Sequence, residues 1–93
     1  MSNNTYLQTK IKATLVQLME ADKKFKLAKE AGENWYHNRR LLRFLNGSKT
    51  FDQWAKENMF NRYAVDYLVL KSERDLLQQE LDFLHKVTEV ASR

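Results

Sequence analysis

Two histidine–carboxylate pairs are the side chains of this sequence best spaced for metal or acid–base chemistry. Glu33 and His37 lie four residues apart, and Asp82 and His85 lie three residues apart. On a helix each spacing places both side chains on one face. A protein metal site needs at least three ligands, and neither a His-Glu-x-x-His pattern nor a carboxylate-bridged di-iron pattern occurs. We therefore interpret both pairs as surface ion pairs.

Other catalytic signatures are missing from the sequence. There are no cysteines, so thiolate nucleophiles, thiolate metal sites and disulfides are excluded. The two glycines, Gly32 and Gly47, cannot form a glycine-rich phosphate loop, and no serine lies in a nucleophile-elbow pattern. We expect a non-enzymatic protein with no cofactor, no metal ion and no small-molecule substrate.

A cluster of basic and aromatic residues is better suited to binding. The candidate contact residues are Trp35, Tyr36, Arg39, Arg40 and Arg43, joined by Lys49, Lys56 and Arg62 from the predicted bend. Arginine beside aromatic rings contacts phosphates and stacks on bases in nucleic-acid complexes, and it also forms hot spots of protein interfaces. A purely structural role is the third alternative, with Trp35 in the core and the arginines at a helix C-terminus.

Two long apolar stripes at helical spacing indicate the elements that position this cluster. The first stripe is Leu7, Ile11, Thr14, Leu18, Ala21, Phe25, Ala28, Gly32, Trp35 and Leu42. The second stripe is Tyr63, Tyr67, Leu70, Arg74, Leu77, Leu81, Leu84, Thr88 and Ala91. Steps of three and four residues are typical of helices that meet along a seam. We predict an all-α fold, an antiparallel hairpin of two long helices with a short helix at the bend.

Capping residues set the expected boundaries at about 5–45, 51–57 and 61–90. Asn46-Gly47 can end the first helix, because glycine accepts a left-handed conformation. Thr50 and Gln53 form a capping-box pattern at the start of the short helix. Asn58 and Asn61 are both suited to cap the final helix.

The predicted bend near Asp52 also sets an expected register. Level pairs are Leu84 with Ala21, Leu77 with Ala28, and Leu70 with Trp35. Arg74 then lies near Ala31 and Gly32, where Glu30 and Glu33 could pair with it. We interpret this arginine as a residue that fixes register, the usual role of a polar seam residue.

Apolar residues outside the seam indicate a further interface. They are Leu15, Val16 and Met19 on the first helix, and Leu76, Phe83, Val87 and Val90 on the last. A lone hairpin would leave them in water, which is typical of an interaction surface. We expect a homodimer that forms a four-helix bundle or coiled coil. The alternative is that this face binds a different protein.

The segment from Thr50 to Leu68 loosely fits a helix-turn-helix, which supports nucleic-acid binding. Two features argue against it. Met59 stands in the turn where glycine is usual, after Asn58 where an apolar residue is usual. The second helix of the pattern also carries too much apolar surface to lie in a major groove.

Length and composition fit a single domain spanning all 93 residues. Residues 1–49 carry ten Lys and Arg against four Asp and Glu, whereas residues 50–93 carry six against eight. The two halves can therefore attract each other across the hairpin or a dimer. The alternative is that the charge of the basic half attracts an acidic partner or nucleic acid. With no signal peptide and no apolar run of membrane-spanning length, we expect a cytoplasmic protein.

Taken together, these features favour a small protein-interaction module. We expect a regulator, adaptor or inhibitor of a larger protein, a kind of protein that would suit a phage or mobile element. The alternative is a nucleic-acid-binding protein that uses the basic end of the hairpin.

Overall fold

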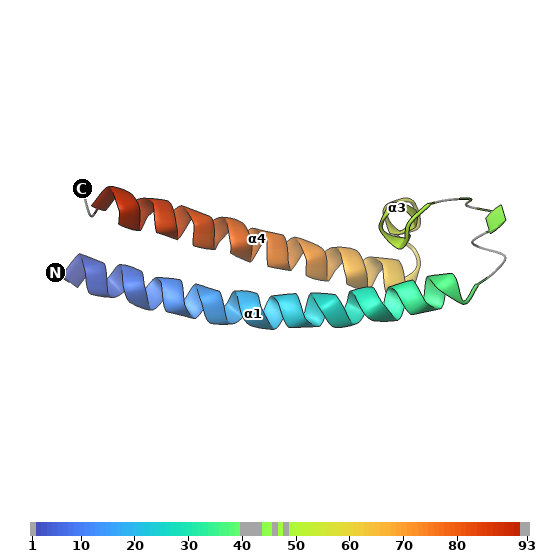
Figure 1. The fold of residues 1–93 in the computed structure, drawn as a ribbon, viewed down its shortest axis with the longest axis horizontal. Helices are drawn as coiled ribbons and strands as arrows, with labels where there is room; N and C mark the ends of the chain where they lie inside the picture. The colour runs from blue at the N-terminus through green and yellow to red at the C-terminus, as the bar shows by residue number, and fades with distance from the viewer. Residues whose placement is uncertain (1, 40–43, 46, 48, 92–93) are drawn as a thin grey trace.

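The computed structural model describes residues 2–39, 44–45, 47 and 49–91, and the chain in these ranges is helical without strands. Its helices with defined bounds are α1 (Ser2–His37), α3 (Phe51–Glu57) and α4 (Arg62–Ala91), and residues 44–45 are helical as well. The two long helices lie side by side and antiparallel, with both termini at one end and α3 at the other (Figure 1). The molecule measures 61 × 20 × 18 Å. The predicted all-α hairpin with a short helix at the bend is confirmed.

The capping residues at the bend act as their types predict. The Thr50 side chain accepts a hydrogen bond from the Gln53 backbone N–H, and the Gln53 side chain accepts one from the Thr50 N–H, which completes the capping box. Asn61 accepts hydrogen bonds from the N–H groups of Tyr63 and Ala64, so it caps α4. Asn58 instead follows the last residue of α3.

The prediction that the first helix continues to Leu45 is wrong. Helix α1 ends at His37, about two turns earlier. Asn38 forms a turn there, and the Arg39 N–H donates to the Tyr36 carbonyl. The physical reason is tertiary: the chain must leave α1 early for α3 to fold back onto it. The Tyr36 hydroxyl secures this return by donating to the Lys49 carbonyl at 3.0 Å.

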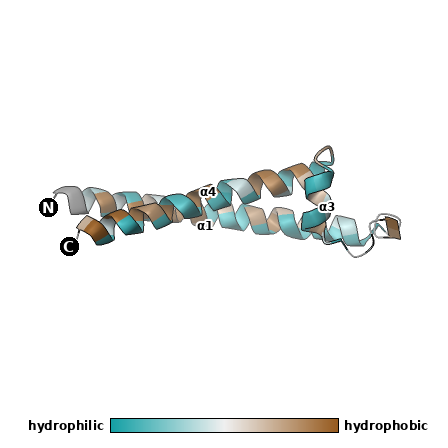
Figure 2. Ribbon diagram, turned by 90° about the horizontal axis from the view of Figure 1, so that it is seen from above, coloured by the Kyte–Doolittle hydropathy of each residue, from teal (hydrophilic) through white to brown (hydrophobic). Residues whose placement is uncertain are grey.

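An aromatic cluster forms the core where the three helices meet. Its buried residues are Phe25, Tyr36, Phe51, Trp54, Ala55, Ala64 and Tyr67, and Trp35 and Tyr63 pack against them. Phe51 lies directly on Gly32, because any Cβ at that position would overlap its ring. Hydrophobic and hydrophilic segments alternate along both long helices, as expected for amphipathic helices with one buried stripe (Figure 2).

The register of the hairpin differs from the predicted one by about two helical turns. Arg74 lies level with Asp22 and Phe25, not with Ala31 and Gly32, so its predicted pairing with Glu30 or Glu33 is wrong. Trp35 likewise stacks on Tyr63 rather than lying level with Leu70. The displacement matches the early end of α1, because a first helix that stops two turns sooner moves the return point by the same amount.

Ion pairs join the two long helices on opposite flanks. Lys10 of α1 lies 3.6 Å from Glu80 of α4, so the cation comes from the basic half and the carboxylate from the acidic half, as expected. Arg74 of α4 lies 3.7 Å from Asp22 of α1, so here the cation comes from the acidic half and the carboxylate from the basic half. Attraction between the halves therefore explains only part of their pairing.

Candidate functional site

Two arginines and two aromatic rings form a continuous row at the bend. The Arg39 guanidinium lies 5.1 Å from the centroid of the Trp35 ring. Trp35 stacks on Tyr63 with 5.2 Å between ring centroids, and the Arg62 guanidinium lies 5.3 Å from the Tyr63 centroid. We call Arg39, Trp35, Tyr63 and Arg62 the cation–aromatic row. Cations held over ring faces in this way gain cation–π stabilisation.

A hollow of about 360 Å³ adjoins this row. It is lined by Trp35, Trp54, Asn58, Phe60 and Asn61. Phe60 is fully exposed, and its neighbour Met59 is mostly exposed. The row and the hollow share Trp35, so together they form one region, which we call the bend surface.

Hydrogen bonds between side chains and the backbone hold the two asparagines of the hollow in place. Asn58 donates from Nδ2 to the Trp54 carbonyl at 2.8 Å. The Asn61 side-chain oxygen accepts from the Tyr63 N–H at 2.9 Å. Both amides are therefore fixed by the same turns that end α3 and begin α4. The bend surface is built on capped helix ends and a packed aromatic core.

Asp52 joins α3 to α4 through its carboxylate. Its carboxylate accepts a hydrogen bond from the Tyr67 hydroxyl at 2.6 Å, and it pairs with Lys71 and Lys56 at 3.1 Å each. The Tyr67 hydrogen bond, followed by those of the two lysines, lowers the pKa of Asp52 well below its usual range. Burial, reinforced by the Asp52 hydrogen bond, raises the pKa of the Tyr67 phenol. Asp52 therefore carries a negative charge in the folded protein at neutral pH.

The eight predicted contact residues separate into different environments. Tyr36 is 1% exposed, so the expectation that its side chain meets a partner needs correction. The physical reason is that its ring packs against Phe51 and Trp54 in the core. Lys49 and Lys56 remain exposed but pair with Glu57 and Asp52, respectively.

Arg39 and Arg62 differ from these lysines. Both are exposed, and neither forms an ion pair with any residue in the described ranges. Trp35 is half-buried. Arg40 and Arg43 lie outside the described residues. Of the predicted set, the structure therefore brings Trp35, Arg39 and Arg62 together.

Five residues of the bend surface were not predicted as contact residues: the aromatic residues Tyr63, Trp54 and Phe60, and the asparagines Asn58 and Asn61. The Arg62 guanidinium lies over the Tyr63 ring. Buried Trp54 and exposed Phe60 both line the hollow. A signal for Phe60 exists in the sequence, because it lies between Asn58 and Asn61, the asparagines expected to cap helices. Phe60 lies outside the helical periodicity of both stripes, so the seam pattern does not assign it a buried position.

The helix-turn-helix pattern does not give a free recognition helix. Its second helix is the start of α4, where Ala64 and Tyr67 are buried and Tyr63 packs against the aromatic cluster. These residues face the rest of the hairpin, so they are not available to enter a groove of DNA.

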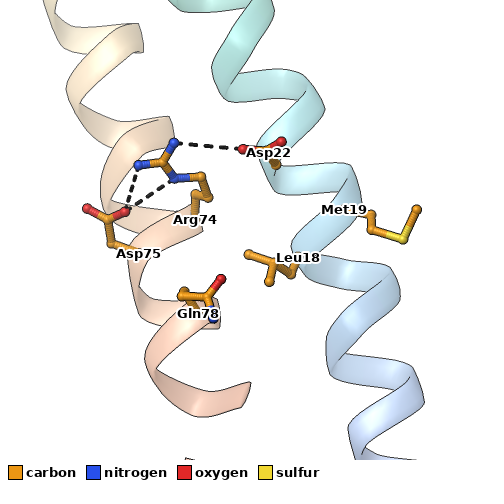
Figure 3. A pocket seen from close by; sticks show the side chains of 6 residues that line it. All are labelled: Leu18, Met19, Asp22, Arg74, Asp75 and Gln78. Atoms are coloured by element: carbon orange, nitrogen blue, oxygen red, sulfur yellow. Dashed lines mark hydrogen bonds and ion pairs between the residues drawn. The ribbon is translucent and has the colours of Figure 1, made fainter. Parts of the chain in front are cut away.

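The residues predicted for self-association do not share one face. Figure 3 shows Met19 on α1 pointing away from α4, although Met19 lines the same groove as Asp75 and Gln78 of α4. A separate hollow near the end of α4 is lined by Phe83, Lys86, Val87, Val90 and Ala91. Glu80 lies just before this hollow along α4, and its partner is Lys10. The Lys10–Glu80 pair lies on the opposite flank of the hairpin from the Asp22–Arg74 pair. The Leu15, Val16 and Met19 group on α1 and the Leu76, Phe83, Val87 and Val90 group on α4 are therefore distinct patches.

A polar groove between the long helices surrounds Arg74. The groove, about 440 Å³, is lined by Leu18, Met19, Asp22, Arg74, Asp75 and Gln78 (Figure 3). The Arg74 guanidinium lies 4.1 Å from the Phe25 ring centroid and donates to Asp75 at 3.0 Å. Hydrogen bonding from Lys26 is the main influence that lowers the pKa of Asp22. The charges in this groove are mutually compensated, which suits a structural role across the seam.

Other kinds of site receive no support from the described part of the chain. No group of three His, Asp or Glu side chains gathers there as metal ligands. None of the helices described has an apolar stretch sufficient to cross a bilayer. Comparison of the chain with protein-family models, curated proteins and solved structures finds no match.

Proposed function

We propose that this protein is a non-enzymatic interaction module of the cytoplasm that binds a larger protein through the bend surface, as a regulator, adaptor or inhibitor. The observation that carries the proposal is the cation–aromatic row, in which exposed Arg39 and Arg62 lie on aromatic rings beside the fully exposed Phe60. Tryptophan, tyrosine and arginine dominate the hot spots of protein interfaces. Their placement over a packed core lowers the entropic cost of binding.

Capture experiments test this proposal directly. The tagged protein and an Arg39→Glu/Arg62→Glu variant are used to capture partners from extract of the native host. A Lys23→Glu/Lys24→Glu variant is the matched control, because it changes the net charge equally on exposed residues of α1. We expect a protein that the wild type and the control retain and the arginine variant loses. Equal capture by all three would contradict the proposal.

Nucleic acid is the second candidate partner, and the stacked arginines are the observation that favours it. Arginine and aromatic rings support single-stranded binding through stacking and phosphate contacts. Binding through several phosphates weakens steeply as salt rises. An anisotropy titration with mixed-sequence duplex and single strands at several salt concentrations distinguishes the two. Failure to bind below roughly 100 μM at low salt would exclude nucleic acid, because even non-specific binding is visible there.

We also infer that the hairpin pairs with a second copy of itself through α4. Val69, Leu76, Phe83 and Val90 recur every seven residues and are all at least half exposed; we call them the α4 stripe. Phe83, Lys86, Val87 and Val90 border a hollow and have the spacing of a four-residue hole that receives a side chain from a facing helix. An antiparallel second copy can place its Val69 in this hole, and the twofold axis repeats the contact.

A further inference from the structure

We propose that the bend surface binds an acidic polypeptide segment bearing an aromatic or other large apolar side chain, which enters the hollow while neighbouring carboxylates pair with Arg39 and Arg62. This inference rests on the proposed function, because it gives the chemistry of the partner bound at the same surface.

Charge complementarity is the first argument. Three of the described cations at the bend already have carboxylate partners: Lys49 pairs with Glu57, and Lys56 and Lys71 pair with Asp52. Arg39 and Arg62 have none within the described ranges, although Asp52 and Glu57 lie on the adjacent helix. Both guanidinium groups can therefore pair with carboxylates of another molecule.

The position of these two guanidinium groups is the second argument. Each lies over an aromatic ring, so its orientation is restricted before any partner arrives. A guanidinium presents its donors as a planar fork that matches a carboxylate. Holding that fork in place reduces the rotamer entropy lost on binding. The row therefore favours ligands with planar anionic groups.

The hollow supplies the apolar part of the site. Trp35 and Trp54, with ring centroids 5.5 Å apart, line it together with exposed Phe60. Its volume of about 360 Å³ lies near the lower end of the range for ligand clefts, which is about 300–1,000 Å³. Such a space suits one large side chain rather than an extended ligand. Trp35 belongs to both the row and the hollow, so anion and apolar group must be neighbours in the ligand.

An acidic polypeptide fits this arrangement better than a nucleic acid. Single-stranded nucleic acid is held by a positively charged track along several nucleotides and by successive stacking platforms. At the cation–aromatic row the described residues offer two cations without ion-pair partners, Arg39 and Arg62, and one adjoining hollow, whereas Lys49 and Lys56 already pair with Glu57 and Asp52. One apolar anchor with nearby carboxylates uses all of these features.

Tryptophan fluorescence provides a direct test, since the two tryptophans of the chain, Trp35 and Trp54, both line the hollow. The full-length protein is titrated with a random copolymer of glutamate and tyrosine, with polyglutamate, with a copolymer of lysine and tyrosine, and with oligo(dT). Selective excitation of tryptophan avoids the tyrosine of the copolymers. We expect the glutamate–tyrosine copolymer to bind most tightly. Tighter binding of the lysine copolymer, of oligo(dT) or of polyglutamate overturns the inference.

Substitutions then locate the binding surface. An Arg39→Gln/Arg62→Gln variant should bind the glutamate–tyrosine copolymer roughly tenfold more weakly or worse, since arginines are among the residues that dominate binding at interface hot spots. The control Lys23→Gln/Lys24→Gln removes the same charge from exposed residues outside the bend surface. Phe60→Ser should weaken binding without altering helicity, because Phe60 is fully exposed. Equal weakening in the lysine control, or no weakening in the arginine variant, overturns the inference.

The outcome is separable from that of the proposed function. If the copolymer fails to bind while a host protein is still lost from the Arg39→Glu/Arg62→Glu variant, the bend surface binds protein and only the acidic chemistry is wrong. If the copolymer binds as expected but no host protein depends on these arginines, the chemistry of the surface stands and the proposed function fails.

Discussion

The half of the hairpin that contains the bend and the half that contains the termini are built differently. In the bend half three helices meet, and the core consists largely of aromatic rings. In the terminal half two helices meet alone (Figure 1). The buried side chains there are Thr14, Ala21, Leu81 and Leu84.

This difference explains which surface of each half is available for interaction with another molecule. Helix α3 covers the aromatic cluster, so the bend half has a complete core and presents an ordered surface on top of it. The terminal half has no third helix among the described residues, and most of the α4 stripe remains exposed along it. A two-helix layer can bury only one stripe of each helix. We therefore expect the bend half to provide stability and the terminal half to depend on association.

The largest effect should come from truncating Phe51 in the bend half. Its ring contacts Gly32 and packs against Tyr36, Trp54 and Tyr67, so Phe51→Ala should lower the free energy of unfolding by about 3–5 kcal/mol. The matched truncation in the terminal half, Leu84→Ala, should cost about 2 kcal/mol, the low end for a buried leucine. Urea unfolding followed by circular dichroism measures both. Equal losses would remove the contrast between the halves.

Adding a methyl group under the same ring should also destabilise the protein. Gly32→Ala would normally stabilise a helix interior by about 1 kcal/mol. Here the new Cβ overlaps the Phe51 ring, and overpacking should cost about 1–3 kcal/mol.

The neighbouring exposed alanine is the control for this substitution. Ala31→Gly should lower the free energy of unfolding by about 1 kcal/mol through helix propensity alone. Opposite substitutions at adjacent positions should therefore both destabilise. A more stable Gly32→Ala variant in thermal unfolding would show that the Phe51 contact is not tight.

Removing the charge of Asp52 should loosen α3 with an intermediate effect. Asp52→Asn should cost about 1–2 kcal/mol at neutral pH, because it weakens the contacts with Tyr67, Lys56 and Lys71 on a partly exposed carboxylate. The exposed Asp66→Asn is the control. Urea unfolding of both variants measures the difference.

The effect of Asp52 should depend on pH with a defined sign. Its pKa in the folded protein lies below the ordinary value of 3.8, so the folded state favours the ionised form. The resulting stability is present above pH 3.8 and is lost as the pH falls further toward the lowered pKa. The wild type should therefore lose its advantage over Asp52→Asn in that range. An advantage that grows on acidification would contradict this assignment.

The smallest effect on folding should come from the α4 stripe, although its effect on association should be decisive. Leu76→Glu should leave the stability of a single hairpin within about 0.5 kcal/mol, as for most surface substitutions. It should nevertheless reduce the mass in solution to 11.1 kDa, that of one chain. Sedimentation equilibrium measures this mass.

Met19→Glu is the matched control, because Met19 and Leu76 are each 65% exposed but lie on different flanks. We expect this variant to retain the mass of the wild type. If Met19→Glu dissociates the protein and Leu76→Glu does not, the α1 patch forms the interface. A wild type of 11.1 kDa at micromolar concentration would exclude self-association.

Much of the fold could be predicted because its determinants are local. The Thr50–Gln53 capping box and the bounds of α3 depend on residues within one turn, and the predicted range of α4 is correct within one residue at each end. The predicted end of α1 is about two turns too late. Asn38, directly after His37, is a weak local stop signal, and the stronger Asn46-Gly47 pattern lies eight residues further along the chain.

The candidate site was predictable in its chemistry and less so in its membership. Arg39, Arg62 and Trp35 could be selected by type, since arginine beside aromatic rings is typical of binding surfaces. Lys49 and Lys56 have the same charge but pair with carboxylates: the Lys56–Asp52 pair follows from i,i+4 spacing within α3, whereas only folding brings Glu57 to Lys49. Tyr36 is adjacent to Trp35 in the chain but turns into the core.

The sequence by itself determined that the protein is a helical hairpin, since helical periodicity and capping act over three or four residues. Only the tertiary structure decided the register of the two long helices, the pairing of Arg74 and the composition of the bend surface. These depend on contacts between residues far apart in the chain, such as Phe51 against Gly32, Trp35 against Tyr63, and Arg74 beside Asp22. Close packing of large rings is specific to the folded arrangement, and no local pattern encodes it.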